Sequence, residues 1–283
     1  FKQEHPEYLV GSYDKRPRHG QWTAYDYGQA AIRDRKFRRL EEVCQNYDVD
    51  GIELDFFRHG VLFKSTAWGG KASDEELDMM TDLIRRLHRM TEEEGLKRGK
   101  PLLIAVRVPD SVEYCRGIGL DIERWLSEGL VDILITTCYF RLNPWEYSVE
   151  LGRRHGVPVY ASLSESRVNE KVEGKDGEFT RQWNTLSYRA RAMEAWQAGV
   201  DGIYMFNFFN PNRPEWRELG DPKTLAGLDK LTFVTCRNGN PNMWLAGGEA
   251  LQNRTILTPA NPAVIGRDTP AAFDLRVGDD LGE

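Results

Sequence analysis

Two carboxylates lie two residues apart in the segment VDGIELDFFRH at residues 49–59, and they are the residues best suited to chemistry. Side chains alternate between the faces of a β-strand, so Glu53 and Asp55 point one way while Ile52 and Leu54 point the other. Inward-facing carboxylates are costly unless they are paired, and carboxylates with perturbed pKa values gather where reactions occur. Glu53 and Asp55 are therefore the first candidates for acid–base chemistry or substrate contact.

Alternating strands and helices must position these carboxylates. Apolar runs predict further strands after the one at residues 49–57, and these lie at 101–108, 131–140, 157–163 and 200–209. Helical spacing of apolar residues predicts helices at 30–47, 73–90, 121–130, 144–155 and 180–198. Strands that alternate with helices indicate parallel pairing through crossover helices. The helix at 73–90 opens on Ser73 and Glu76, which have the spacing of a capping box.

A short phrase recurs where helices lead into strands. It reads VDGI at residues 49–52, VDIL at 131–134 and VDGI again at 200–203. A shared helix-to-strand junction is typical of a repeating βα unit, and both a (β/α)8 barrel and an open doubly wound sheet contain such units. No strand is followed by GxGxxG, which disfavours the dinucleotide-binding form of the open sheet.

Composition narrows the function classes. The chain has 283 residues, of which 40% are hydrophobic and 29% charged, and its formal net charge is −6. These values are typical of a soluble globular protein. Acidic residues are spread along the chain without a basic stripe, which disfavours nucleic acid as a partner. No apolar run approaches the roughly 20 residues that a membrane-spanning helix needs, so we expect no membrane partner.

The cysteines and histidines indicate neither a cofactor nor a metal site. Cys44, Cys115, Cys138 and Cys236 lack CxxC spacing, and we expect free buried thiols. His59 lacks a partner histidine at the spacing of metal ligands. We therefore expect no metal and no cofactor.

The character of the chain changes after about residue 228. Strand-like pieces at 231–235, 255–257 and 273–277 stand among proline, glycine and asparagine. We expect residues 1–228 to form one domain and residues 229–283 to begin a β-rich accessory domain, or to add strands to the first. Both ends look like cuts in a longer polypeptide, and they indicate neither localisation nor oligomeric state.

At these residues the chain resembles a known family. HPEY at residues 5–8 and, more strongly, residues 27–59 resemble the glycosyl-hydrolase-like family ten, barrel proteins distantly related to the α-amylase and α-galactosidase superfamily. The second block includes IRD at 32–34 and YDVDGIELDFFR at 47–58. The resemblance implies a (β/α)8 TIM barrel in which residues 49–57 are the fourth strand. Strands four to eight then lie in this chain, and the first three precede it.

The resemblance also implies glycoside hydrolysis, which uses two carboxyl groups flanking the scissile bond. Active sites of such barrels lie at the C-terminal ends of the strands. In the related superfamily the strand-four aspartate is the nucleophile, which implies that role, or that of a base, for Asp55. Glu165 follows the strand at 157–163 and is the candidate general acid/base, with Asp110 as a reserve acid. The alternative is that Glu53 and Asp55 form ion pairs with Arg58 and Arg107.

Several other side chains are expected to contact a carbohydrate substrate. Four tryptophans lie in or near loops after strands, and aromatic rings suit the CH faces of sugars. The candidates for substrate binding are Glu53, Arg58, His59, Trp68, Arg107, Tyr139, Trp145, Trp183, Asn207 and Trp216. Trp125 and Trp196 lie in predicted helices and are expected in the core.

Other barrel chemistries fit the sequence less well. The segment NFFNPNRP at 207–214 lacks the glycine-rich loop of a phosphate site, and the predicted strands carry no lysine for a Schiff base. A carbohydrate-binding barrel without catalytic activity remains an alternative function. The separation of Asp55 from Glu165 discriminates, because retaining enzymes need about 5–5.5 Å and inverting enzymes about 6.5–9.5 Å.

Overall fold

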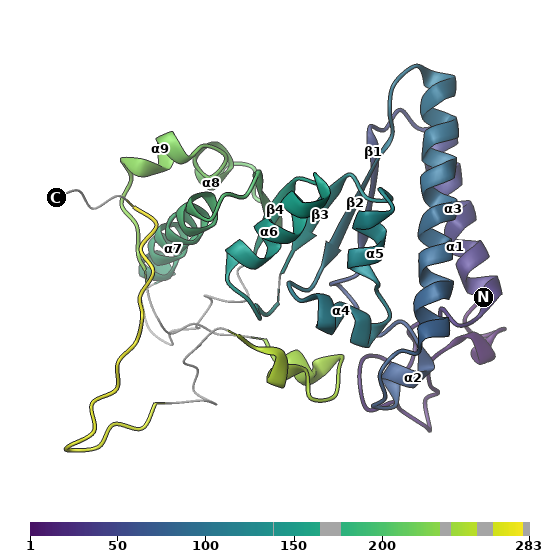
Figure 1. Cartoon of the computed structure of the whole chain (residues 1–283), viewed down its shortest axis with the longest axis horizontal. Coiled ribbons are helices and arrows are strands. Elements are labelled where there is room, and N and C mark those ends of the chain that lie inside the picture. The colour runs from purple at the N-terminus through teal and green to yellow at the C-terminus, as the bar shows by residue number, and fades with distance from the viewer. Residues whose placement is uncertain (138, 165–176, 233–238, 254–262, 280–283) are drawn as a thin grey trace.

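The structure is a computed structural model that describes residues 1–137, 139–164, 177–232, 239–253 and 263–279, without the side chains of 177–184. The strands of these residues form one parallel five-stranded sheet in the order β1-β2-β3-β4-β5 (Figure 1). Their bounds are β1 Gly51–Asp55, β2 Leu103–Val108, β3 Ile133–Thr136, β4 Val159–Ser164 and β5 Gly202–Phe206. The predicted α/β class and parallel pairing are therefore confirmed.

Helices connect the strands, and α3, α5 and α6 lie on one side of the sheet in Figure 1. The α-helices are α1 Ala30–Asn46, α2 Lys64–Ala67, α3 Asp74–Arg98, α4 Val112–Ile118, α5 Ile122–Ser127, α6 Trp145–His155, α7 Gly177–Gln197, α8 Glu215–Glu218 and α9 Pro222–Ala226. The 3₁₀ helices are η1 Pro6–Tyr8, η3 Pro241–Met243 and η4 Gly248–Leu251. Among the described residues, no helix is both long and apolar enough to cross a membrane.

Strand register gives the sheet two different faces. Glu53 pairs with Ala105 and Asp55 with Arg107, so these residues lie on one face. Tyr204 of β5 lies on the same face, and its hydroxyl donates to Glu53 Oε1 at 3.0 Å, which joins the first strand to the last. A flat sheet would separate these strands by four strand spacings of about 4.8 Å. The sheet therefore curls into a half-barrel whose concave face carries Glu53 and Asp55.

The opposite, convex face holds the larger hydrophobic core. Ile104, Val106 and Leu134 are fully buried there. They share one apolar cluster with Ile84 and Leu87 of α3. Burial on this face is what fixes the register, because a slip of one residue would exchange the apolar face with the face that carries the carboxylates.

The recurring VD phrase has a structural role. Asp132 Oδ2 accepts from the Ile104 backbone N–H at 2.7 Å, and Asp201 Oδ2 accepts from the Val159 N–H at 2.8 Å. Each aspartate thus ties its own helix-to-strand junction to the strand on one side. Asp50 lies at the sheet edge, and its side chain pairs with Lys100 instead, at 3.2 Å.

Most predicted elements are confirmed with shorter strands. The capping box is present, because Ser73 Oγ accepts from the Glu76 N–H and the Glu76 carboxylate accepts from the Ser73 N–H. Helix α4 was not predicted. Its start is marked by Ser111, whose side chain accepts from the Tyr114 N–H, and its end by Gly119 at φ 99°. Since α4 spans only seven residues, it is too short to show clear helical periodicity.

The segment after residue 228 packs partly on the sheet's C-terminal end. Trp244 and Leu245 are buried in the core cluster, and the Tyr114 hydroxyl donates to Pro241 O at 2.6 Å. Residues 273–277 form no strand, the predicted strand at 255–257 lies outside the described residues, and a bridge joins Gly266 to Thr269. The β-rich accessory domain stays a prediction.

Candidate active site

Asp55 lies at the C-terminal end of β1 and is held from three directions. Its Oδ1 accepts from the backbone N–H groups of Phe57 and Arg58, both at 3.0 Å. Its Oδ2 accepts from Nη2 of Arg107 on the neighbouring strand. Both oxygens therefore accept hydrogen bonds from the protein itself, although the side chain is 29% exposed.

Arg107 is the buried centre of the concave face. Its side chain is fully buried, with Nε 3.9 Å from Glu53 Oε1 and the guanidinium 4.0 Å from the Phe206 ring centroid. A fully buried guanidinium needs paired carboxylates, and the aromatic ring adds a cation–π contact. The pairing of Arg107 with Asp55 matches the structural alternative recognised in the sequence. Arg107 does not itself face the solvent.

Glu53 is in a different environment from Asp55. Its Oε1 accepts from the Tyr204 hydroxyl at 3.0 Å, and its side chain is 34% exposed. Burial raises the pKa of Glu53, and the nearby Asp55 charge raises it further, while Tyr204 and Arg107 oppose the shift. Burial and Glu53 raise the pKa of Tyr204 as well. A carboxyl group that holds its proton to a higher pH than usual is suited to acid–base chemistry.

Other predicted substrate contacts gather at the same end of the sheet. Arg58 Nη1 donates to the Tyr139 hydroxyl, and the Tyr139 ring lies 5.5 Å from that of Phe206. His59 lies beside Arg58 in the lining of a groove of about 530 Å³, which Glu53 and Asp55 also line. Partial burial and the charge of Arg58 lower the pKa of His59. The structure thus brings Glu53, Asp55, Arg58, His59, Arg107 and Tyr139 together.

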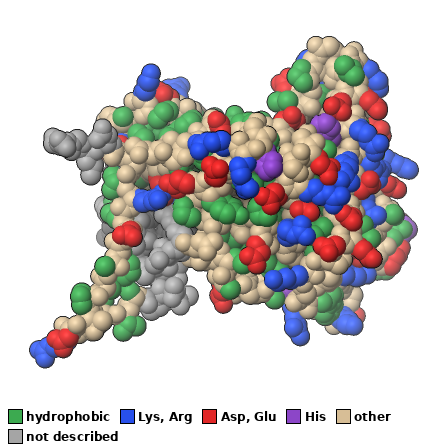
Figure 2. Space-filling model, in the orientation of Figure 1, with side chains coloured by type: hydrophobic (Ala, Val, Ile, Leu, Met, Phe, Trp, Pro, Cys, Tyr) green, Lys and Arg blue, Asp and Glu red, His purple; other side chains and the backbone are tan. Residues whose placement is uncertain are grey.

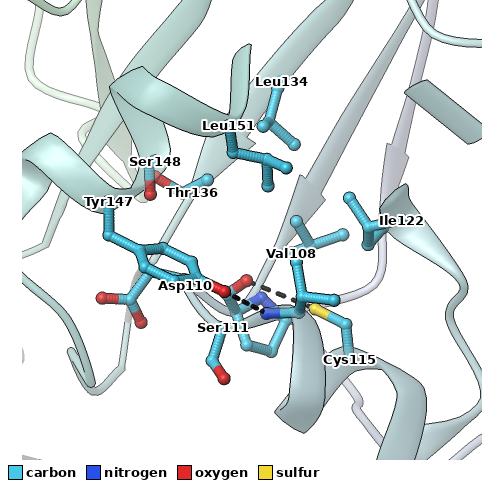
Figure 3. A pocket seen from close by; sticks show the side chains of 12 residues that line it. Val108, Asp110, Ser111, Cys115, Ile122, Leu134, Thr136, Tyr147, Ser148 and Leu151 are labelled. Carbon is cyan, nitrogen blue, oxygen red and sulfur yellow. Dashed lines mark hydrogen bonds between the residues drawn. The ribbon is translucent and has the colours of Figure 1, made fainter. Parts of the chain in front are cut away.

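Asp110, the reserve acid, does not join this group. It follows β2 and is 2% exposed (Figure 3). Its carboxylate accepts from the backbone N–H groups of Leu142 and Asn143 at 2.9–3.0 Å, and its own carbonyl accepts from Asn143 Nδ2 at 2.6 Å. These contacts fix the loop between β3 and α6. Asp110 therefore holds this loop in place, and its burial prevents contact with a substrate.

A small cavity of about 10 Å³ lies beside Asp110 (Figure 3). Thr136 and Ser148 line it, are 2% and 1% exposed, and have no hydrogen-bond partner for their hydroxyls among the described residues. The volume is about that of one water, and an unpaired buried hydroxyl costs roughly 1–3 kcal/mol.

We expect a high-resolution crystal structure to show one ordered water between the Thr136 and Ser148 hydroxyls. The same water should be absent from the Thr136→Val variant, which removes one of its partners. Direct bonding of both hydroxyls to backbone carbonyls would contradict this.

The remaining candidates lie apart from the concave face or outside the described side chains. Trp145 is 3% exposed and packs in the cluster with Val149 and Leu163, so it offers no surface to a sugar. Trp68 is 37% exposed, and its Nε1 donates to Val10 O at 3.0 Å. Glu165 lies outside the described residues, as does the side chain of Trp183 on α7.

The backbone is strained directly after two strands, and we call these two positions the rim. Asn207 follows β5 at φ 52°, and Thr137 follows β3 at φ 64°. Non-glycine residues in this left-handed region cost about 1–3 kcal/mol and gather at functional sites. Trp216 is 49% exposed and packs edge-on against Phe208 at 5.3 Å, so one of the four predicted tryptophans presents a ring near this rim.

Sequence reasoning did not select Tyr204 or Phe206. Both belong to the run VDGIYMFNFF at 200–209, in which alternation places Tyr204 and Phe206 on the same face. That alternation was a usable signal for a tyrosine hydroxyl on the concave face. Among the described residues, no group of three or more histidine, cysteine, aspartate or glutamate side chains could hold a metal ion.

Comparisons with known proteins add little. No protein-family model matches the chain, and no curated protein matches it. The chain is similar to a solved glycoside hydrolase family 18 N-acetylglucosaminidase from Paenibacillus barengoltzii, at 17% identity and a TM-score of 0.36. The match covers 48% of this chain and 45% of that one, so the chain spans less than half of that protein. A similarity of this size carries no information about activity.

Proposed function

We propose that this chain is the C-terminal part of a (β/α)8-barrel glycoside hydrolase, which cleaves a poly- or oligosaccharide at the concave face of its sheet. In this proposal β1–β5 are strands four to eight, residues 1–228 belong to the barrel, and residues 229–283 begin a β-rich accessory domain. The curled, all-parallel sheet supports the barrel, as do the two junction aspartates that each bind a neighbouring strand.

The observation that carries the proposal is the contrast between two carboxylates on one strand. Asp55 is bound to a fully buried guanidinium and two backbone N–H groups, whereas Glu53 accepts one tyrosine hydroxyl and has a raised pKa. A carboxyl group with a raised pKa is suited to be the general acid of glycoside hydrolysis, which also needs a second carboxyl group.

The geometry changes the roles expected from the sequence. We assign Glu53, instead of Glu165, as the general acid/base, because Glu53 keeps one carboxylate oxygen without a hydrogen-bond partner among the described residues. Asp55 becomes a positioning residue that holds Arg107. Glu165, directly after β4, stays the proposed second carboxyl group, and Asp110 leaves the proposed site.

The alternative is a carbohydrate-binding barrel protein without catalysis. The engagement of both Asp55 oxygens favours it, because a carboxylate that is fully hydrogen-bonded makes a poor nucleophile. Both functions place a sugar on the concave face of the sheet. They differ in whether new reducing ends are formed.

The experiment that separates them measures binding and turnover on the same panel of polysaccharides. We expect at least one polysaccharide to bind and to release new reducing ends, detected by a reducing-sugar assay. Binding without any released reducing ends would support the binding protein. Neither binding nor turnover across the panel would contradict both functions.

A further inference from the structure

The segment 239–253 comes after the last strand and packs on loops at the C-terminal ends of earlier strands. It contains η3 and η4, and in Figure 1 it is the yellow-green part of the chain beside α4. The Gly239 N–H donates to Tyr139 O at 2.8 Å, and the Asn253 N–H donates to Leu142 O at 2.8 Å. Both acceptors belong to the β3 loop, which connects β3 to α6. The segment therefore holds this loop at two points.

Trp244 of this segment also contacts the β1 loop, which connects β1 to α2. Its ring centroid lies 5.3 Å from that of Phe57 in the β1 loop, and 6.0 Å from those of Tyr139 and Phe140 in the β3 loop. Trp244 is 2% exposed, and Phe57 and Phe140 are fully buried. A Cβ atom at Gly60 would lie 2.3 Å from the indole, so the ring rests directly on the backbone of the β1 loop. One buried side chain therefore joins the two loops.

The two loops carry Arg58 and Tyr139, which lie next to the candidate carboxylates. Arg58 Nη1 donates to the Tyr139 hydroxyl, and the Arg58 backbone N–H donates to Asp55 Oδ1 at 3.0 Å. The Tyr139 ring lies 5.5 Å from the ring of Phe206, which packs on the Arg107 guanidinium. Arg58 is exposed and Tyr139 is partly exposed. A guanidinium and a phenol can both hydrogen-bond to sugar hydroxyls, so this pair is suited to hold a saccharide beside Glu53.

Ring packing between the loops differs from the ion pairs found on the surface. Arg85 of α3 and Arg124 of α5 share Glu128, and Figure 2 shows acidic and basic side chains interspersed over the face seen there. Exposed ion pairs contribute little and are screened by salt. Buried rings are close-packed, so a smaller ring changes the position of the groups around it. The relative position of the two loops therefore depends on Trp244.

The proposed chemical groups are held by other contacts. Glu53 accepts from the Tyr204 hydroxyl, and Asp55 pairs with Arg107, so neither contact includes a residue of the segment 239–253. The Trp244 ring is buried and cannot itself be a platform for a sugar. Any effect of Trp244 on a bound saccharide must therefore act through the two loops.

We propose that Trp244 is a positioning residue for substrate binding. It fixes the β1 and β3 loops relative to each other, so that Arg58 and Tyr139 present their polar groups to a saccharide beside Glu53. In this role the segment 239–253 acts with the barrel, although it follows the last strand. The identity of the ligand rests on the proposed function, whereas the fixing of the loops does not.

Hydrogen exchange followed by mass spectrometry tests the fixing of the loops without a substrate. Trp244→Phe leaves a space between the loops, so exchange in peptides that cover 57–60 and 139–143 should be several-fold faster than in wild type. Exchange in β2 should stay unchanged, because only a global loss of stability would accelerate it. Trp196→Phe is the matched control, because Trp196 packs in the other apolar cluster and its Nε1 donates to Leu219 O. Unchanged exchange in both loops, or an equal increase in β2 or in the control, would overturn the inference.

Steady-state kinetics on the preferred polysaccharide tests the consequence for binding. Trp244→Phe is expected to raise KM roughly two- to tenfold, the effect of about one hydrogen bond, and to leave kcat and its pH profile unchanged. Tyr139→Phe removes the hydroxyl that accepts from Arg58 and keeps the ring, so it should raise KM by a similar factor. The double variant should then show little further increase, because both changes act on the same pair.

The outcomes separate this inference from the proposed hydrolysis. A lower kcat with an unchanged KM in Trp244→Phe would overturn the positioning role, as would KM effects that multiply in the double variant. If the chain binds a polysaccharide without cleaving it, the same factors are expected in the Kd measured by calorimetry. That result would support the positioning role and contradict only the hydrolysis.

Discussion

Glu53→Gln is expected to lower turnover of the preferred polysaccharide by roughly 10²–10⁴-fold, the usual contribution of a general acid/base. Glutamine keeps the shape of the side chain and can still accept from the Tyr204 hydroxyl, so the fold is retained. The affinity for the polysaccharide should change little. The measurement is the initial rate of reducing-end release at saturating substrate, with calorimetry for affinity.

Tyr204→Phe provides the companion measurement for Glu53. The tyrosine hydroxyl donates to Glu53 and holds its pKa down against the larger effect of burial. Without that donor the pKa of Glu53 rises further, so a reaction that needs protonated Glu53 keeps its rate to a higher pH. We expect the alkaline limb of the kcat/KM profile to move to higher pH. An unmoved limb in Tyr204→Phe, or full turnover in Glu53→Gln, would contradict the role of Glu53.

Asp55→Ala is expected to destabilise the fold by about 3 kcal/mol. Removing one partner of a buried ion pair costs roughly 3–5 kcal/mol, because the other charge stays buried. Here Arg107 is fully buried, and the 29% exposure of Asp55 places the expected value at the low end of that range. Urea unfolding of wild type and variant measures the difference.

Two further variants make this prediction specific. Asp50→Ala removes a carboxylate whose side chain is 95% exposed, and its effect should stay below about 0.5 kcal/mol. Asp55→Ala combined with Arg107→Met removes both charges, so the pair should cost less than the sum of the single changes. If Asp55 were instead the nucleophile, Asp55→Asn would abolish turnover even under conditions in which the variant stays folded.

The sheet was predictable because its strands combine strong local signals. Continuous apolar runs, the repeated VD junction and the Ser73–Glu76 capping box each indicate the same alternation of helix and strand. In the sequence, the VD phrase indicates only a repeating βα unit. Its physical cause, a side chain that accepts from a neighbouring strand, depends on a contact across 28 residues in the case of Asp132 and Ile104.

The site was predictable only as far as strand alternation reaches. Alternation places Glu53 and Asp55 on one face, and the sequence leaves the pairing of Asp55 with Arg107 as an alternative to catalysis. Which carboxylate stays accessible depends on Tyr204, 151 residues from Glu53, and on the curl of the sheet. No local pattern encodes that contact.

Exposure of aromatic residues was the least predictable property. Trp145 was expected on a rim and is 3% exposed, because it begins α6 and its ring packs beneath the Arg141 guanidinium at 4.3 Å. Trp145 lies in the first turn of the predicted helix at 144–155, but the sequence does not indicate whether its ring faces the core or the solvent. Trp244, which packs on Phe57 at 5.3 Å, comes from a segment that no motif marks.

A crystal structure of the Glu53→Gln variant with a bound oligosaccharide of the preferred polymer tests the central claim most directly. The account predicts sugar units on the concave face of the sheet, with a glycosidic oxygen about 2.6–3.2 Å from the side chain at position 53. A saccharide bound away from the concave face, with the side chain at position 53 contacting only Tyr204, would contradict it.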